Sequence, residues 1–172
     1  MKIKNVVPTE KADSASTQSQ TNLALRILVV DDDSDIRLLN AEVLKRSGYE
    51  VDTAEDGEAG WKALHAVSYA PDSYDLLITD NDMPGLSGLD LVKKLRAARM
   101  ELPVIMATGT LPPQELARNP WLQPAATLLK PYTIEELLGT VREVLRVNDS
   151  AFRDIAPPPS WQSQPSADGL RF

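Results

Sequence analysis

The sequence predicts an α/β fold in which five strand–helix units build one parallel sheet. Short apolar runs alternate along the chain with segments whose apolar residues recur at helical spacing. The apolar runs are nearly continuous, as is typical of parallel strands that are buried on both faces. The chain of 172 residues has the length of one ordinary domain with its own core.

The first two units are regular. RILVV at 26–30 is the first predicted strand, and Gly48 closes the helix that follows it. The apolar residues of that helix are Ile36, Leu39, Val43 and Leu44. The second unit joins the strand EVDTA at 50–54 to another helix. Its apolar residues are Ala59, Ala63, Leu64 and Val67.

The third and fourth units differ in the quality of their helices. DLLIT at 75–79 is the third predicted strand, and Ser87 can cap the helix after it. PVIMA at 103–107 is the fourth strand. The helical stretch near 113–119 is expected to be short and irregular, because prolines limit it on both sides. These prolines are Pro112, Pro113, Pro120 and Pro124.

The fifth unit starts with the strand ATLLK at 126–130. Thr133 and Glu136 form a capping box, in which each side chain can satisfy a free backbone donor of the other residue. The helix that this box opens has apolar residues at helical spacing, namely Leu137, Leu138, Val141, Val144 and Leu145.

The five units are predicted to form a doubly wound sheet. Right-handed crossovers leave few topologies, and the flavodoxin-like strand order 2-1-3-4-5 is the common small one. The predicted domain covers residues 23–148. The flanking segments 1–22 and 149–172 are rich in Ser, Gln and Pro. We expect both to be flexible tails, because they have too little apolar surface to offset the entropy of ordering.

The composition excludes several classes of protein. The net charge of −7 argues against a nucleic-acid-binding face, since such faces are usually basic. The chain has no cysteine, which excludes disulfides and thiolate metal sites. It contains no apolar run near the roughly 20 residues that span a bilayer and no apolar core of a signal peptide. We therefore expect a cytoplasmic protein that does not bind a membrane.

Carboxylates gather where the first and third strands end. Asp31 and Asp32 follow the first strand directly, and Asp80 follows the third. In the predicted order these strands are neighbours, about 4.8 Å apart, and ligands bind beyond their carboxyl ends. Three carboxylates cannot all stay ionised in one crevice without a counter-charge. The sequence therefore predicts an oxygen-ligated Mg²⁺.

Two more strand ends lead into the same crevice. Thr108 follows the fourth strand, and Lys130 ends the fifth. A cation, a hydroxyl and an ammonium around one carboxylate suit phosphoryl transfer. Asp80 would attack phosphorus in line, while the metal and Lys130 neutralise the phosphoryl oxygens.

The neighbouring acids Asp33 and Asp35 have another explanation. With Ser34 as cap, they lie at the start of a helix, where negative charge is favourable. A calcium-binding EF-hand loop has the same spacing of acids as Asp31, Asp33, Asp35 and Glu42. That loop needs a glycine where this chain has Ile36, and it needs a helix, not a strand, before it.

Four segments of the chain together resemble the receiver domain of bacterial two-component response regulators. They are ILVVDDDSDIR, LLITDNDMPGLSG, PVIMATG and LLKPYT. They match its four motifs in order and at the usual spacings, over about residues 24–147. The resemblance implies that Asp80 is the phospho-acceptor, with a sensor histidine kinase or a phosphotransfer protein as donor. It also implies a cis bond between Lys130 and Pro131.

The resemblance also assigns the remaining site residues. It implies that Asp32 is a direct Mg²⁺ ligand and that Asp31 acts mainly through water. The backbone carbonyl of Asp82 would complete the protein ligands. Thr108 and Lys130 would contact the phosphoryl group.

One family feature is absent from this sequence. Three residues before the lysine, many members have an aromatic side chain that moves on activation, and here that residue is Thr127. We expect Trp121 or Tyr132 to supply the aromatic of this face.

The leading functional interpretation is a stand-alone receiver that signals to an unknown downstream protein by contact. It would catalyse only its own phosphorylation and dephosphorylation, so it would not be an enzyme in the usual sense. A homodimer is compatible with the sequence. The alternative is a Mg²⁺-dependent phosphatase of the haloacid dehalogenase type, since Asp31 and Asp33 have its D-x-D spacing. A third interpretation is a receiver that binds partners without being phosphorylated.

Overall fold

The computed structural model describes residues 24–67, 73–109 and 113–153. Five parallel strands form one sheet in the order β2-β1-β3-β4-β5, which confirms the predicted fold class and topology. The strands are β1 (Arg26–Val30), β2 (Glu50–Ala54), β3 (Leu76–Asp80), β4 (Val104–Thr108) and β5 (Ala126–Leu129).

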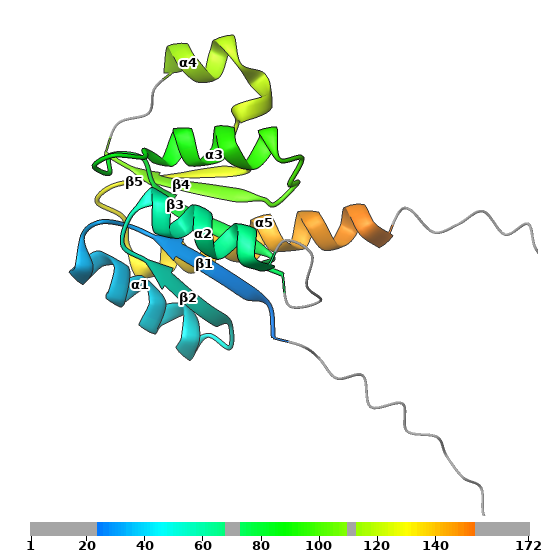
Figure 1. Ribbon diagram of the computed structural model, residues 1–172. Coiled ribbons are helices and arrows are strands. Elements are labelled where there is room, and N and C mark those ends of the chain that lie inside the picture. The colour runs from blue at the N-terminus through cyan, green and yellow to red at the C-terminus, as the bar shows by residue number, and fades with distance from the viewer. Residues whose placement is uncertain (1–23, 68–72, 110–112, 154–172) are drawn as a thin grey trace, which may run out of the picture.

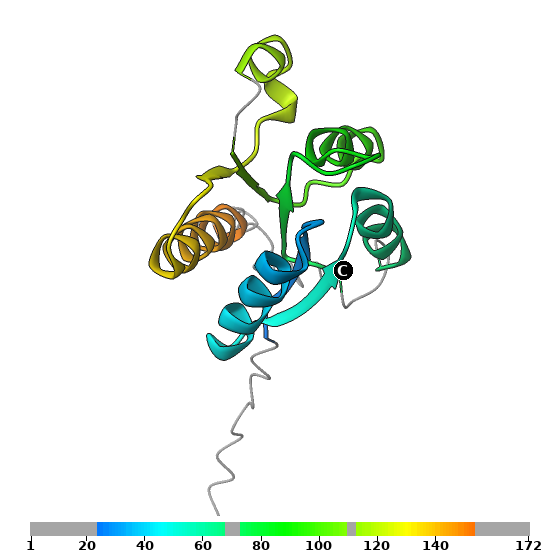
Figure 2. The same cartoon turned by 90° about the vertical axis from the view of Figure 1, so that its left-hand side faces the viewer.

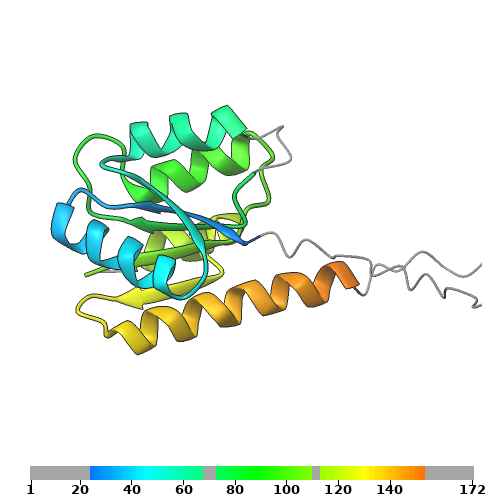
Figure 3. The same ribbon diagram turned by 90° about the horizontal axis from the view of Figure 1, so that it is seen from below.

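Helices cover both faces of the sheet. Helices α1 (Ser34–Arg46) and α5 (Ile134–Arg153) lie on one face, whereas α2 (Gly57–Val67) and α3 (Gly88–Ala97) lie on the other (Figure 3). Each strand therefore has two buried sides. Along β1, Ile27 belongs to the apolar cluster under α1 and α5, and Leu28 to the cluster under α2 and α3. This two-sided burial explains why the strands read as continuous apolar runs.

The fourth helix is short, as predicted. Helix α4 (Pro113–Arg118) is followed by a single 3₁₀ turn, η1 (Pro120–Leu122). Figure 1 places α4 beyond α3, at one end of the molecule. The side chain of Leu122 is fully buried in the cluster under α2 and α3, so the turn is anchored to the core by one residue.

Two strands lie one residue later than predicted. β3 includes Asp80 and β4 includes Thr108, so each of these residues ends its strand and does not follow it. The reason is the hydrogen-bonded ladder, which continues to the polar residues. Asp80 pairs with Ala107, and Thr108 pairs with Leu129. Both polar side chains are therefore fixed by sheet backbone.

Helix α1 differs from its prediction at two points. The N-cap is Asp33 and not Ser34, because the Asp33 carboxylate accepts hydrogen bonds from the backbone N–H groups of Asp35 and Ile36. The side chain of Leu39, expected in the core, is 55% exposed. The buried face instead includes Asn40, whose amide donates to the hydroxyl of Tyr132 at 2.8 Å. A buried amide is tolerated in a core when its hydrogen bonds are satisfied, so the buried face of α1 can include Asn40 in place of the neighbouring Leu39.

Of the two predicted tails, only residues 149–153 fall within the described residues. Helix α5 ends at Arg153, five residues beyond the boundary predicted at residue 148. Residues 149–153 contain neither glycine nor proline, so no helix-breaking residue ends the helix earlier. The predicted tail 1–22 and the rest of the second tail lie outside the described ranges, so their flexibility stays a prediction. No helix in the described residues is long and apolar enough to cross a membrane.

Candidate functional site

Four of the predicted site residues lie along one edge of the sheet. Asp31 follows β1, Asp80 ends β3, Thr108 ends β4 and Lys130 follows β5. These four strands are consecutive in the sheet, and Figure 2 looks onto the edge where they end. The strand order reverses between β1 and β3, which is the place where doubly wound sheets bind ligands.

Three carboxylates converge at this edge, as predicted. Asp31, Asp32 and Asp80 each offer one carboxylate oxygen, and these oxygens lie within 4.8 Å of one another. Asp31 and Asp80 are only 2% and 6% exposed, whereas Asp32 is exposed. We call these three residues the acidic cluster. Its hard oxygen donors fit a divalent cation such as Mg²⁺, and the exposed side leaves room for the waters that Mg²⁺ retains.

The ammonium group of Lys130 joins two members of the acidic cluster. Its Nζ donates to Asp31 Oδ2 at 2.8 Å and to Asp80 Oδ2 at 2.9 Å. Burial raises the pKa of Asp31 and outweighs the opposing effect of the ammonium. Burial by itself would lower the pKa of Lys130, but the hydrogen bonds to Asp31 and Asp80 raise it. One cation thus faces three acids, and the cluster attracts further positive charge.

The backbone around Lys130 fixes its direction. The N–H of Lys130 donates to the carbonyl of Thr108 at 3.0 Å, which extends the pairing of β4 and β5. The Lys130–Pro131 bond is cis, as predicted. The capping box is also confirmed, since Thr133 N–H donates to Glu136 Oε2 at 2.7 Å and Glu136 N–H donates to Thr133 Oγ1 at 3.2 Å.

Asp82 takes part in the site through its side chain. The buried hydroxyl of Thr108 donates to Asp82 Oδ2 at 3.2 Å, and Asn81 Nδ2 donates to Asp82 Oδ1 at 3.1 Å. The N–H of Asp82 donates to Asp80 Oδ1 at 3.2 Å. Only the backbone carbonyl of Asp82 was expected in the site from the sequence, and the role of this carboxylate was missed. Its position two residues after Asp80, on the same loop, was the available signal.

A glycine allows α3 to begin directly against the loop that carries Asp80. A side chain at Gly88 would collide with the backbone carbonyl of Asp80. The N–H of Gly88 instead donates to the carbonyl of Asn81 at 3.3 Å, and Ser87 caps the helix as predicted, accepting from the N–H of Asp90. This close approach holds the third carboxylate in place from the helix side.

Asp33 and Asp35 lie outside the acidic cluster. The carboxylate of Asp33 is exposed and caps α1, and Asp35 lies in the first turn of that helix. The carboxylates of Asp31 and Asp33, the D-x-D pair, therefore do not share one site.

The two aromatic candidates lie in different environments. Tyr132 is half-buried, and its hydroxyl accepts from Asn40 of α1, which ties the segment after Lys130 to the first helix. Burial raises the pKa of Tyr132 and outweighs the opposing effect of the bond to Asn40. Trp121, on η1, is 56% exposed.

Comparison with known proteins identifies the family. Residues 27–142 match the model of the response regulator receiver domain, and the chain belongs to this family. It is 33% identical over 122 residues to the transcriptional regulatory protein RprY of Bacteroides fragilis, covering 71% of this chain and 50% of RprY. It is 38% identical over 128 residues to the chemotaxis protein CheY1 of Helicobacter pylori, covering 73% of this chain and 100% of CheY1.

Solved structures agree with this assignment. The response regulator TrrA of Thermotoga maritima, solved in complex with Mg²⁺ and BeF, matches with a TM-score of 0.58 and 34% identity. The match covers 70% of this chain and 98% of that structure. Among the relatives in sequence, the chain spans about half the length of RprY and the full length of CheY1.

Proposed function

We propose that this chain accepts a phosphoryl group on Asp80 from a sensor histidine kinase or a phosphotransfer protein. Mg²⁺ would be held by Asp31, Asp32 and Asp80, together with the backbone carbonyl of Asp82. The observation that carries the proposal is the Lys130 ammonium, which bridges the carboxylates of Asp31 and Asp80 at the switch point of the sheet. An ammonium placed there can neutralise a group that is attached to Asp80.

The proposed reaction transfers one phosphoryl group between two proteins. A carboxylate oxygen of Asp80 attacks phosphorus, the bond from phosphorus to the donor's histidine nitrogen breaks, and that nitrogen keeps the electron pair. The product is an acyl phosphate on Asp80. When bound, Mg²⁺ supplies positive charge that offsets the acidic cluster and the phosphoryl oxygens. Lys130 turns from the carboxylate of Asp80 toward the new phosphoryl oxygens.

Thr108 is proposed to report the phosphorylated state. Its hydroxyl now donates to Asp82 at 3.2 Å. A phosphoryl oxygen on Asp80 competes for this donor, so the bond to Asp82 breaks when Thr108 turns toward the phosphoryl group. Because Thr108 ends β4 and pairs with Leu129, this movement can reach β5.

The output is proposed to be contact with a downstream protein. The net charge of −7 does not favour direct binding of nucleic acid. The only chemistry assigned to the chain is the formation and hydrolysis of its own acyl phosphate. We therefore propose a signalling switch and not an enzyme with a separate substrate.

The test is phosphorylation by acetyl phosphate, with and without Mg²⁺, followed by mass spectrometry of the intact protein. We expect one phosphoryl group per chain, formed only with Mg²⁺ and absent from Asp80→Asn. Asp35→Asn is the matched control, because it removes a nearby acid outside the acidic cluster and should be phosphorylated like the wild type. Equal phosphorylation of Asp80→Asn and the wild type would refute the assignment.

The same reactions, with an added assay for inorganic phosphate, separate the two rival interpretations. A phosphatase would release many equivalents of inorganic phosphate per chain, and a binding module that is never phosphorylated would show no added mass. The site and the comparisons do not favour the phosphatase, since Asp33 caps α1 and lies outside the acidic cluster.

A further inference from the structure

Arg37 contacts the loop that carries two members of the acidic cluster. From the first turns of α1, its NH1 group donates to the carbonyl of Asp31 at 2.6 Å and lies 3.4 Å from the carbonyl of Asp32. Neither the family resemblance nor the apolar pattern of α1 assigned it a role. Its guanidinium is nevertheless as close to this loop as Lys130 is to the carboxylates.

The loop between β1 and α1 has few other constraints. The N–H of Asp31 donates to the carbonyl of Ala54 at 3.3 Å, and the N–H of Asp33 donates to Asp31 Oδ1 at 3.0 Å. Between these two bonds lies Asp32, whose side chain is exposed. A donor that binds both carbonyls limits the rotation of the peptide units on either side of Asp32. The directions of the two carboxylates depend on these peptide units.

We propose that Arg37 is a positioning residue, which clamps the main chain of Asp31 and Asp32 so that both carboxylates face the same cation. The inference rests on the proposed Mg²⁺ site. It assigns to Arg37 a hydrogen-bonding role toward carbonyl groups and no contact with the metal or the phosphoryl group.

Charge and position predict opposite effects for Arg37. A guanidinium beside a cation site repels the cation, so if only its charge mattered, removing it would strengthen Mg²⁺ binding. If Arg37 holds the ligands in place, removing it weakens Mg²⁺ binding, because the cation has to order the loop itself. Residues that orient metal ligands typically change metal affinity by about 10–100-fold when they are replaced. The sign of the change therefore decides between the two.

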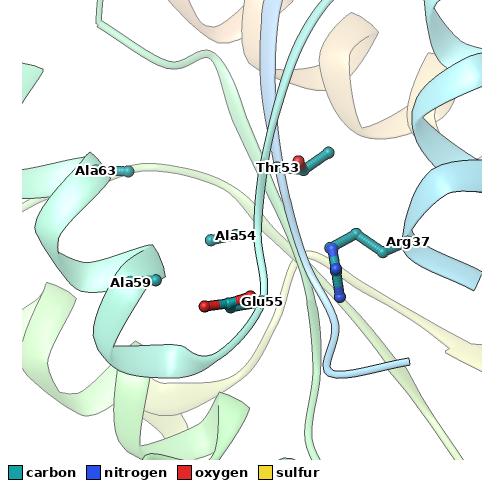
Figure 4. Close-up of a pocket in the computed structure, with 6 residues that line it drawn as sticks. All are labelled: Arg37, Thr53, Ala54, Glu55, Ala59 and Ala63. Carbon is teal, nitrogen blue, oxygen red and sulfur yellow. The ribbon is translucent and has the colours of Figure 1, made fainter. Parts of the chain in front are cut away.

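The surroundings of Arg37 make truncation tolerable. Its side chain lines a pocket of about 310 Å³, together with Thr53, Ala54 and Glu55 at the end of β2 and Ala59 and Ala63 of α2 (Figure 4). Shortening the side chain enlarges an existing pocket and creates no sealed void in the core. We therefore expect Arg37→Ala to fold.

The experiment compares three variants of the full chain. Arg37→Ala removes the clamp, and Arg37→Lys keeps the charge with a single donor group. Arg46→Ala removes the same charge from an exposed ion pair of the same helix, with Glu42. The dissociation constant for Mg²⁺ is measured by NMR titration, and the free energy of unfolding is measured in EDTA.

We expect Arg37→Ala to weaken Mg²⁺ binding about 10-fold. Arg37→Lys should lie between Arg37→Ala and the wild type, and Arg46→Ala should bind like the wild type. Unchanged or tighter binding by Arg37→Ala would overturn the proposal, as would equal weakening by Arg46→Ala. If Arg37→Ala fails to fold, the proposal stands only if Arg37→Lys binds Mg²⁺ more weakly than the wild type. A wild-type chain without Mg²⁺ affinity would refute the metal site itself, and the clamp with it.

Discussion

Two of the places where carboxylates meet a basic side chain in the described residues differ in burial and in charge. One is the acidic cluster with Lys130, at the carboxyl ends of the strands. The other lies around the start of β1. We call it the amino-edge cluster, and it consists of Arg26, Asp52, Tyr74 and Asp75.

The amino-edge cluster is a structural tie. The guanidinium of Arg26 binds Asp52 Oδ2 at 2.6 Å and lies 4.7 Å from the ring centroid of Tyr74. The backbone N–H of Arg26 donates to Asp75 Oδ2 at 2.7 Å, which joins β1 to the segment before β3. The Asp52 side chain is 45% exposed, so water shares in its solvation.

The comparison shows that an ion pair by itself does not mark a functional site. At the acidic cluster the side chains of Asp31 and Asp80 are 3% and 8% exposed, and one ammonium serves both. The carboxylates are buried and outnumber the ammonium that neutralises them, so binding of a further cation is electrostatically favourable. The amino-edge cluster has neither the burial nor the same excess.

The largest expected effect is on stability when each basic residue is replaced by methionine. Lys130→Met leaves two buried carboxylates without their counter-ion and should cost about 3–5 kcal/mol in EDTA at neutral pH. Arg26→Met should cost about 1 kcal/mol, because its partner is half solvated. Urea unfolding measures both values. An equal or greater loss for Arg26→Met would break the comparison.

The next effect concerns the amino-edge cluster at high pH. Burial, followed by the hydrogen bond that its hydroxyl donates to Asp52, raises the pKa of Tyr74 from its ordinary value of 10.0 to about 12. The raised pKa contributes stability in full below pH 10, and this contribution is lost as the pH rises through 12. Relative to Tyr74→Phe, the wild type should lose about 2 kcal/mol by pH 12. Parallel pH profiles of the two proteins would contradict the shift.

A third effect concerns Mg²⁺ and should be confined to the carboxyl edge. At ten times its dissociation constant, Mg²⁺ should stabilise the wild type by about 1.4 kcal/mol. Arg26→Met should show the same gain and Asp80→Asn a much smaller one, measured by thermal unfolding with and without Mg²⁺. Loss of the gain in Arg26→Met would mean that the two ends of the sheet are coupled.

Much of this arrangement could be predicted from the sequence, because the apolar runs define the strands and strand order places their ends. Asp31, Asp80, Thr108 and Lys130 follow from that reasoning alone, since each lies at the end of a strand. Other features depend on tertiary contacts with no local pattern. The carboxylate of Asp82, on the loop after β3, accepts from Thr108 at the end of the neighbouring strand β4. Arg37 donates to carbonyls that precede its own helix. Asn40 could be buried only because Tyr132 accepts its hydrogen bond.

The smallest expected effect is that of removing the two terminal segments. If the acidic cluster and the amino-edge cluster are complete within the described residues, a chain lacking 1–22 and 154–172 should keep both properties. Its free energy of unfolding should stay within about 0.5 kcal/mol of the full chain, as for changes that touch no packed feature. The removed N-terminal segment ends close to Arg26. The amino-edge cluster is therefore more sensitive to the truncation than the acidic cluster. The relevant measurements are urea unfolding, the Tyr74 pH profile and the gain in stability with Mg²⁺. A loss of stability that suppressed the pH profile but left the Mg²⁺ gain intact would show that residues 1–22 belong to the amino-edge cluster.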